Sequence, residues 1–118
     1  TNHRLFVGSN ETQVKRVTVP GSVRELNPAT GSVIWATPLP AGPVVGTPAM
    51  SAGGVIVAAT YNQATPTANA VYLLNASDGS IVNTIPADAP IFAQPVFADT
   101  HLFIATTAGV LTAYSVAP

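Results

Sequence analysis

The sequence contains no cysteine, and this absence excludes disulfides, thiolate metal sites and cysteine nucleophiles. Only 8% of its 118 residues are charged, against about 25% in an ordinary globular domain. The four basic residues form no cluster of the kind that binds nucleic acid, so we expect no nucleic-acid partner. No apolar run approaches the roughly 18 residues of a membrane-spanning helix, so we expect no insertion into a membrane.

The low charge does not indicate disorder, because 47% of the residues are hydrophobic and can form a core. A chain of this length has room for one core, and we expect residues 1–118 to form a single segment. Its surface must consist largely of small polar side chains, which suits an extracytoplasmic protein, whether secreted, periplasmic or at the cell surface. The chain starts at Thr1, a few residues before a strand-like run, and we expect it to be a piece of a longer protein.

Proline and glycine interrupt the chain too often for long helices, with eleven prolines and nine glycines. What remains is a series of short runs rich in β-branched and aromatic residues. These runs are Leu5–Gly8, Val14–Val19, Val23–Leu26, Val33–Trp35, Val55–Ala59, Val71–Leu74, Ile81–Ile85, Pro95–Phe97, Leu102–Ala105 and Val110–Tyr114. Short strands at such regular spacing predict an all-β sandwich, barrel or propeller.

Two segments of the chain repeat at a spacing of nearly fifty residues. Asn27–Ile34 matches Asn75–Val82, 48 positions later, and Gly54–Thr60 matches His101–Thr107, 47 positions later. A period of about 40–50 residues that holds four strands is typical of one β-propeller blade. We therefore expect antiparallel propeller blades in three pieces, at about 1–40, 41–87 and 88–118, with three, four and three strands.

The inner strands of the middle piece favour a propeller over a sandwich. Val55–Ala59 and Val71–Leu74 are apolar at consecutive positions, which indicates burial on both faces. A sandwich with one solvated face would alternate instead. The first piece lacks its inner strand and the third lacks its outer strand, so we expect two open blade faces, both apolar throughout. We expect further blades or a second copy of the chain to cover these faces.

A ten-residue segment resembles a motif of a known family. Leu26–Trp35 reads Leu-Asn-Pro-Ala-Thr-Gly-Ser-Val-Ile-Trp and resembles the tryptophan-docking motif of pyrroloquinoline-quinone-like (PQQ-like) repeats. In that family an apolar residue and an Asp or Asn lead through a Thr-Gly or Asp-Gly turn to a Trp four residues after the Gly. A second copy follows at Leu74 but has Asn83 where the Trp would be. The resemblance implies a quinoprotein-like propeller, of which this chain is a fragment of about two and a half blades.

Seven residues of the two copies form the expected structural motif. They are Asn27, Thr30, Gly31 and Trp35 in the first copy and Asn75, Asp78 and Gly79 in the second. The glycines can supply the positive φ of the hairpin between the two outer strands of a blade. The Asn and Asp side chains can form hydrogen bonds with the turn backbone. The resemblance implies that Trp35 stacks against the neighbouring blade as a structural residue and not as a platform for a cofactor.

The same resemblance raises the question of a cofactor. Quinoprotein dehydrogenases that resemble this repeat hold PQQ between a Trp and a disulfide of adjacent cysteines, with a calcium ion and an Asp base. This chain has no cysteine, its single Trp lies in the docking motif, and its five acidic residues are scattered. We therefore expect no PQQ, no other cofactor and no catalytic residue here. His3 and His101 lack convergent carboxylates, so we expect turn or surface histidines and no metal site.

Three functions remain open. The first is a non-catalytic scaffold or interaction module of a larger extracytoplasmic protein, favoured by blade repeats without a convergent polar cluster. The second is a fragment of a PQQ-dependent alcohol dehydrogenase whose cofactor and catalytic residues lie outside this chain. The third is a propeller of the sensor or outer-membrane assembly type. The fold does not by itself decide between these functions.

Overall fold

The computed structural model describes residues 4–51, 53–98 and 101–115. Twelve strands within these ranges form four antiparallel sheets, which confirms the predicted all-β class. The first sheet contains β1 (Leu5–Ser9), β4 (Ser22–Leu26) and β5 (Val33–Pro38). The second contains β6 (Ala49–Met50), β7 (Val55–Ala59), β8 (Ala70–Asn75) and β9 (Ile81–Pro86). The third contains β10 (Val96–Ala98), β11 (His101–Ala105) and β12 (Leu111–Ser115), and a hairpin pairs β2 (Thr12–Val14) with β3 (Val17–Val19).

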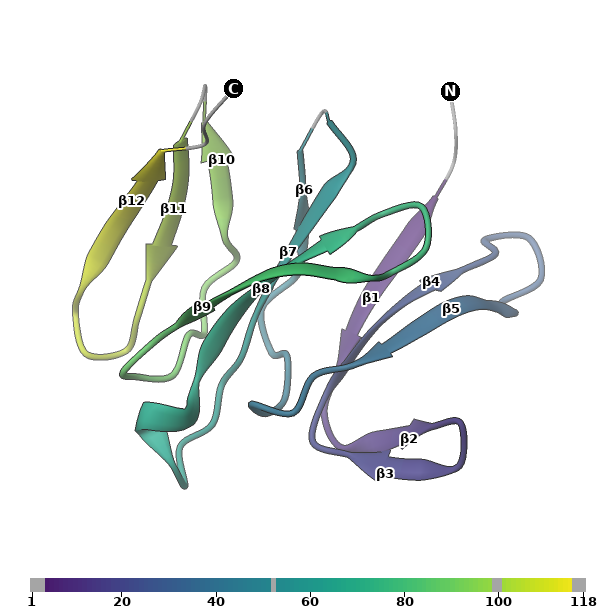
Figure 1. The fold of residues 1–118 in the computed structure, drawn as a ribbon, viewed down its shortest axis with the longest axis horizontal. Coiled ribbons are helices and arrows are strands. Elements are labelled where there is room, and N and C mark those ends of the chain that lie inside the picture. Colours follow the sequence, from purple (N-terminus) through teal and green to yellow (C-terminus); the bar gives the residue numbers. More distant parts are fainter. Residues whose placement is uncertain (1–3, 52, 99–100, 116–118) are drawn as a thin grey trace.

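The three larger sheets stand side by side in chain order, with the second sheet in the middle (Figure 1). In each of them the strands pair in the order in which they occur in the chain, and the β2–β3 hairpin is inserted between β1 and β4. Helical structure in the described ranges is a single 3₁₀ turn at Pro66–Ala68 (η1). In this part of the chain, no helix is long and apolar enough to cross a membrane.

The second sheet is buried on both faces, as its runs of consecutive apolar residues predict. Ile56 and Ala58 of β7 belong to a core shared with the first sheet. Val57 and Ala59, which alternate with them, belong to a second core shared with the third sheet. The alternation of a strand thus directs successive side chains into two different interfaces.

The run Val14–Val19, predicted as one strand, is a hairpin. Val14 pairs with Val17, so that only Lys15 and Arg16 form the turn between β2 and β3. Both turn residues have positive φ, 52° and 68°. Such a turn normally contains Asn or Gly. The sequence carries no such signal here, and for this reason the run resembles a continuous strand.

The repeat alignment is wrong by one residue in β11. Met50 pairs with Ile56, and Phe97 pairs with Leu102. Met50 and Phe97 each lie two residues after a proline, so Leu102 takes the place of Ile56, 46 positions later. The offset is 46 and not 47 because the connection from Phe97 to Leu102 is one residue shorter than the connection from Met50 to Ile56. Strand β6 itself is missing from the predicted runs, since Ala and Met carry no β-branched signal.

The open face of the third sheet is mostly apolar, but not throughout as predicted, because the paired residues His101 and Ser115 also lie on it. It presents Val96 of β10 and Leu111 of β12, which are 52% and 68% exposed. Phe97 and Tyr114 pack into the core shared with the second sheet, and Val96 and Leu111, an odd number of residues away along the same strands, therefore lie on the opposite face.

The open face of the first sheet is only partly apolar, so the prediction for this face is wrong. Val23 faces the core, and the alternating residues Ser22 and Arg24 therefore lie on the open side. The Arg24 guanidinium donates to Thr12 Oγ1 at 3.0 Å and to the Gln13 carbonyl at 2.7 Å. These bonds hold the β2–β3 hairpin against one end of the open face.

Candidate functional site

Trp35 of β5 lies at the contact between the first and second sheets. Its indole Nε1–H donates to the carbonyl of Ala76 at 3.1 Å, and its ring lies 6.0 Å from the Phe6 ring, centroid to centroid. The ring is partly buried against the core that the two sheets share. Trp35 therefore binds the turn between β8 and β9, which connects the two outer strands of the next sheet.

Gly79 of that turn lies directly under the Trp35 ring. A Cβ placed on Gly79 would fall 2.4 Å from Trp35 Cε3, a distance that real Cβ atoms do not show. Gly79 also has a φ of +79°, which residues with a Cβ rarely adopt. The Thr37 hydroxyl, two residues after Trp35, donates to the Gly79 carbonyl. Both the conformation and the close contact require glycine here.

The turn of the first sheet has the same internal structure as the turn of the second. The Gly31 N–H donates to the Asn27 carbonyl at 2.7 Å, and the Gly79 N–H donates to the Asn75 carbonyl at 2.7 Å. The side chains of Asn27 and Asn75 each accept a backbone N–H two residues on, at 2.9 and 3.0 Å. Each Asn therefore stabilises the first half of its turn. Gly31 has a φ of +76°, but a Cβ there would meet nothing within 4 Å.

Thr30 and Asp78 occupy equivalent positions in the two turns and form equivalent bonds. The Thr30 hydroxyl accepts the Ser32 N–H at 3.3 Å, and the Asp78 carboxylate accepts the Ser80 N–H at 2.9 Å. The Ser80 hydroxyl also donates to Asp78, at 2.8 Å. The bond from the Ser80 backbone is the main reason why the pKa of Asp78 is lowered.

Arg4 and Glu25 complete the contact, and the sequence does not mark them. The Arg4 guanidinium forms two bonds with the Glu25 carboxylate, at 2.8 and 2.9 Å, and also donates to the Ala76 carbonyl. The carbonyl of Ala76 thus accepts from both Arg4 and Trp35. The hydrogen bond from Arg4 lowers the pKa of Glu25, and the bond to Glu25 raises the pKa of Arg4.

A signal for this pair exists in the strand pattern, but it requires the correct register. Phe6 pairs with Glu25, and Arg4 lies two residues before Phe6, on the same side of the chain. Without the pairing of β1 and β4, Arg4 is indistinguishable from an isolated surface charge. The residue that pairs with Glu25 on the other side is Trp35, so one row of side chains carries the ion pair and the indole.

The other candidate residues do not converge. His101 is exposed on β11, with its ring 6.1 Å from that of Phe103. His3 lies outside the described residues. Among the residues that the structure does describe, no group of three His, Asp or Glu side chains could hold a metal ion.

Comparisons with known proteins agree with this geometry. The PQQ repeat model described as outer membrane protein assembly factor BamB matches residues 19–117. No curated protein matches the chain.

Two solved structures resemble the fold. A computationally designed protein, Ika4, has a TM-score of 0.63 at 10% identity, over 91% of this chain and 64% of that one. A europium-containing methanol dehydrogenase has a TM-score of 0.58 at 14% identity, over 87% of this chain and 20% of that one. The chain therefore spans less than two thirds of either structure. These likenesses concern the fold alone, and they confirm the predicted propeller blades.

Proposed function

Because the chain belongs to the PQQ-like repeat family, as its match to the model described as outer membrane protein assembly factor BamB shows, we propose that it is a non-catalytic scaffold. In this function the segment binds further propeller blades and partner proteins through its blade faces. The predicted membership of the PQQ-like repeat family is thereby confirmed.

The observation that supports this function most strongly is the difference between Gly79 and Gly31. The two glycines occupy equivalent turns with nearly the same φ, yet Trp35 covers Gly79 and nothing lies within 4 Å of a Cβ on Gly31. The turn around Gly31 in the first sheet thus exposes the same surface that the turn around Gly79 in the second sheet presents to Trp35. A blade that carries an equivalent Trp fits this surface.

The partner that we propose for the exposed faces is another blade of the same kind, from the same protein or from a second copy. Leu111 and Val96 leave apolar area exposed on the open face of the third sheet. Contact between such faces removes apolar surface from water, as it does within the chain. A contact between the first sheet of one copy and the third sheet of another is heterologous.

Within this scaffold function, the family description favours an outer-membrane assembly role in an extracytoplasmic compartment over a sensor or a dehydrogenase fragment. The matching family is described by the name of an assembly factor. A dehydrogenase fragment is less well supported, because the chain has no cysteine and its single Trp is engaged with Ala76 and Gly79. Engagement with the next blade leaves the Trp35 ring unsuited to stack on a cofactor.

The oligomeric state of the isolated chain tests the proposal. We expect light scattering after size exclusion to show a mass that rises with protein concentration. A double variant, Val96→Lys with Leu111→Lys, places two charges on the open face of the third sheet and should reduce this association. Val82→Lys on β9 is the matched control, because Val82 is 58% exposed but belongs to the second sheet, both of whose faces are already covered within the chain. A monodisperse monomer at high concentration would contradict the proposal.

A further inference from the structure

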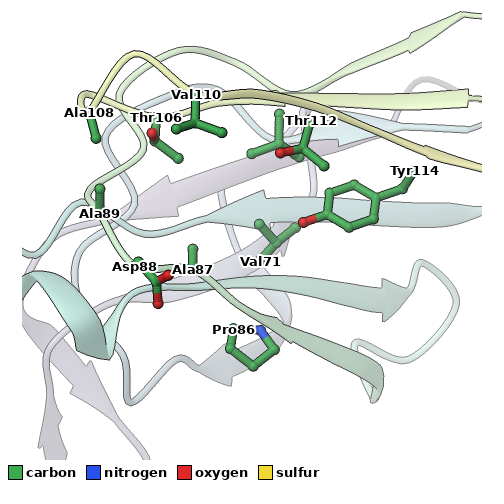
Figure 2. Close-up of a pocket in the computed structure, with 11 residues that line it drawn as sticks. Val71, Pro86, Ala87, Asp88, Ala89, Thr106, Ala108, Val110, Thr112 and Tyr114 are labelled. Carbon is green, nitrogen blue, oxygen red and sulfur yellow. The ribbon is translucent and has the colours of Figure 1, made fainter.

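A pocket of about 230 Å³ lies between the second and third sheets. Figure 2 shows its walls, formed by the Pro86–Ala89 segment on one side and by β12 with the turn before it on the other. Val71 and Ile104 form buried parts of the lining. The ring of Tyr114 extends along the pocket with its hydroxyl directed towards Val71 (Figure 2).

The corresponding space between the first and second sheets is filled by Leu39. The Leu39 N–H donates to the Gly21 carbonyl and the Ala87 N–H donates to the Asn69 carbonyl, both at 2.9 Å, so the two residues occupy equivalent places after the outer strand. Leu39 is fully buried. Ala87 lines the pocket, and its side chain has three carbons fewer than that of Leu39.

Tyr72 fills the remainder of the corresponding space. Tyr72 pairs with Ala58, and Thr112 pairs with Ile104, in equivalent positions of successive sheets. The Tyr72 side chain is 5% exposed, and its hydroxyl accepts the Ala41 N–H at 3.2 Å. Where one interface contains a phenol ring, the other contains Thr112 and open volume. Ile104 is larger than Ala58, but it does not replace the ring.

A buried hydroxyl in the pocket lining lacks a partner. Thr106 Oγ1 is buried and forms no hydrogen bond with any described residue. The equivalent Thr60 donates to Asn69 Oδ1 at 2.8 Å and accepts the Ala70 N–H at 3.1 Å. A buried hydroxyl without a partner is costly, so the arrangement around Thr106 favours a bound polar group.

We propose that this pocket binds a small phenol, as a free molecule or as a tyrosine side chain of a peptide. The Tyr72 ring shows that a phenol fits the equivalent space between two blades of this chain. The volume is sufficient, since an apolar cavity of about 150 Å³ already admits benzene. The phenol hydroxyl binds Thr106, and the exposed carboxylate of Asp88 in the lining disfavours anionic ligands.

Titration with p-cresol, the side-chain analogue of tyrosine, tests this site by calorimetry or by NMR shifts of Thr106, Thr112 and Tyr114. We expect saturable binding, with toluene and 4-methylbenzoate at least tenfold weaker. The valine variant Thr106→Val should reduce the preference for p-cresol over toluene. N-acetyl-tyrosinamide distinguishes the two sources: it binds if the pocket accepts a tyrosine of a peptide, whereas p-cresol alone binds if the ligand is a free phenol.

Two variants place in the pocket the residues that fill the equivalent space between the first and second sheets, Leu39 and Tyr72. Ala87→Leu and Thr112→Tyr should each weaken p-cresol binding at least tenfold, while the melting temperature stays equal or rises, because the pocket is then filled from within. Thr18→Tyr on the exposed β3 adds the same ring elsewhere and should leave binding unchanged. The proposal is overturned if p-cresol does not saturate the wild-type chain, or if both filled variants bind it as well as the wild type.

Discussion

Trp35 and Asn83 occupy the same register position in successive sheets. Trp35 pairs with Glu25 on β4, and Asn83 pairs with Leu73 on β8, next to the same β-bulge in both sheets. Trp35 is partly buried on the turn of the next sheet, whereas Asn83 is exposed on β9. One position of the repeat therefore has two very different environments, and the two residues form a matched pair for mutation.

Trp35→Ala should lower the free energy of unfolding by about 3 kcal/mol, the lower end of the range for buried aromatic residues, because the ring is only partly buried. Asn83→Ala should change it by less than about 0.5 kcal/mol, as is usual for exposed positions. Urea denaturation followed by circular dichroism measures both values. Equal effects of the two substitutions would show that Trp35 does not stabilise the contact between the sheets.

Gly79→Ala and Gly31→Ala separate the cost of the conformation from the cost of the contact. Both residues have positive φ, so each alanine should destabilise the protein by about 1–2 kcal/mol through the backbone. Only the Cβ on residue 79 also collides with Trp35. We therefore expect Gly79→Ala to cost at least about 2 kcal/mol more than Gly31→Ala, since overpacking adds about 1–3 kcal/mol.

The difference in stability between Gly79→Ala and Gly31→Ala also depends on whether the chain is monomeric or oligomeric. If another blade covers Gly31 in an oligomer, Gly31→Ala should weaken association as well as stability. Measuring both variants at low and at high protein concentration distinguishes the two situations. A Gly31→Ala variant that equals Gly79→Ala in dilute, monomeric samples would contradict the observed vacancy beside Gly31.

The Arg4–Glu25 ion pair should make stability depend on acidic pH. Arg4 lowers the pKa of Glu25 in the folded chain, and the Glu25 side chain is only 7% exposed. The stabilisation is therefore present above the pKa of an unfolded glutamate, about 4.3, and is lost as the pH falls through the lower pKa of the folded state. We expect the urea midpoint to fall below about pH 4.

Glu25→Gln identifies the source of this dependence. The variant should be less stable than the wild type at neutral pH and should lose less of its stability on acidification. Asp78→Asn is the control, because the pKa of Asp78 is lowered too, by its bond from Ser80 at an exposed site. If Asp78→Asn and not Glu25→Gln flattens the pH profile, the ion pair does not cause the acid sensitivity.

The sequence predicts those features that one residue type determines locally. Consecutive apolar residues predict the doubly buried β7 and β8, because a strand covered on both faces has no polar side. The repeated turns follow from Asn27 and Asn75. The Arg4–Glu25 pair depends instead on the register of strands 21 residues apart, which no local pattern specifies. The vacancy at Ala87 likewise becomes visible only when two interfaces are compared in three dimensions.

The turn of the β2–β3 hairpin offers a last prediction, since its residues are poorly suited to its conformation. Lys15 and Arg16 both have positive φ, which is unfavourable for residues with a Cβ. Asn-Gly is the preferred pair for such two-residue turns. The double variant Lys15→Asn with Arg16→Gly should therefore raise the free energy of unfolding by about 1 kcal/mol. The gain should appear in global unfolding because Val14, next to the turn, is 6% exposed and packed against the protein.

A double alanine variant separates conformation from charge. Lys15→Ala with Arg16→Ala removes the same two positive charges but keeps a Cβ at both positions, so it should give no gain in stability. Urea denaturation at low and at moderate ionic strength measures both double variants against the wild type. If the alanine variant gains as much as the Asn-Gly variant, and the gain disappears in salt, repulsion between neighbouring cations limits this hairpin and not the positive φ of its turn.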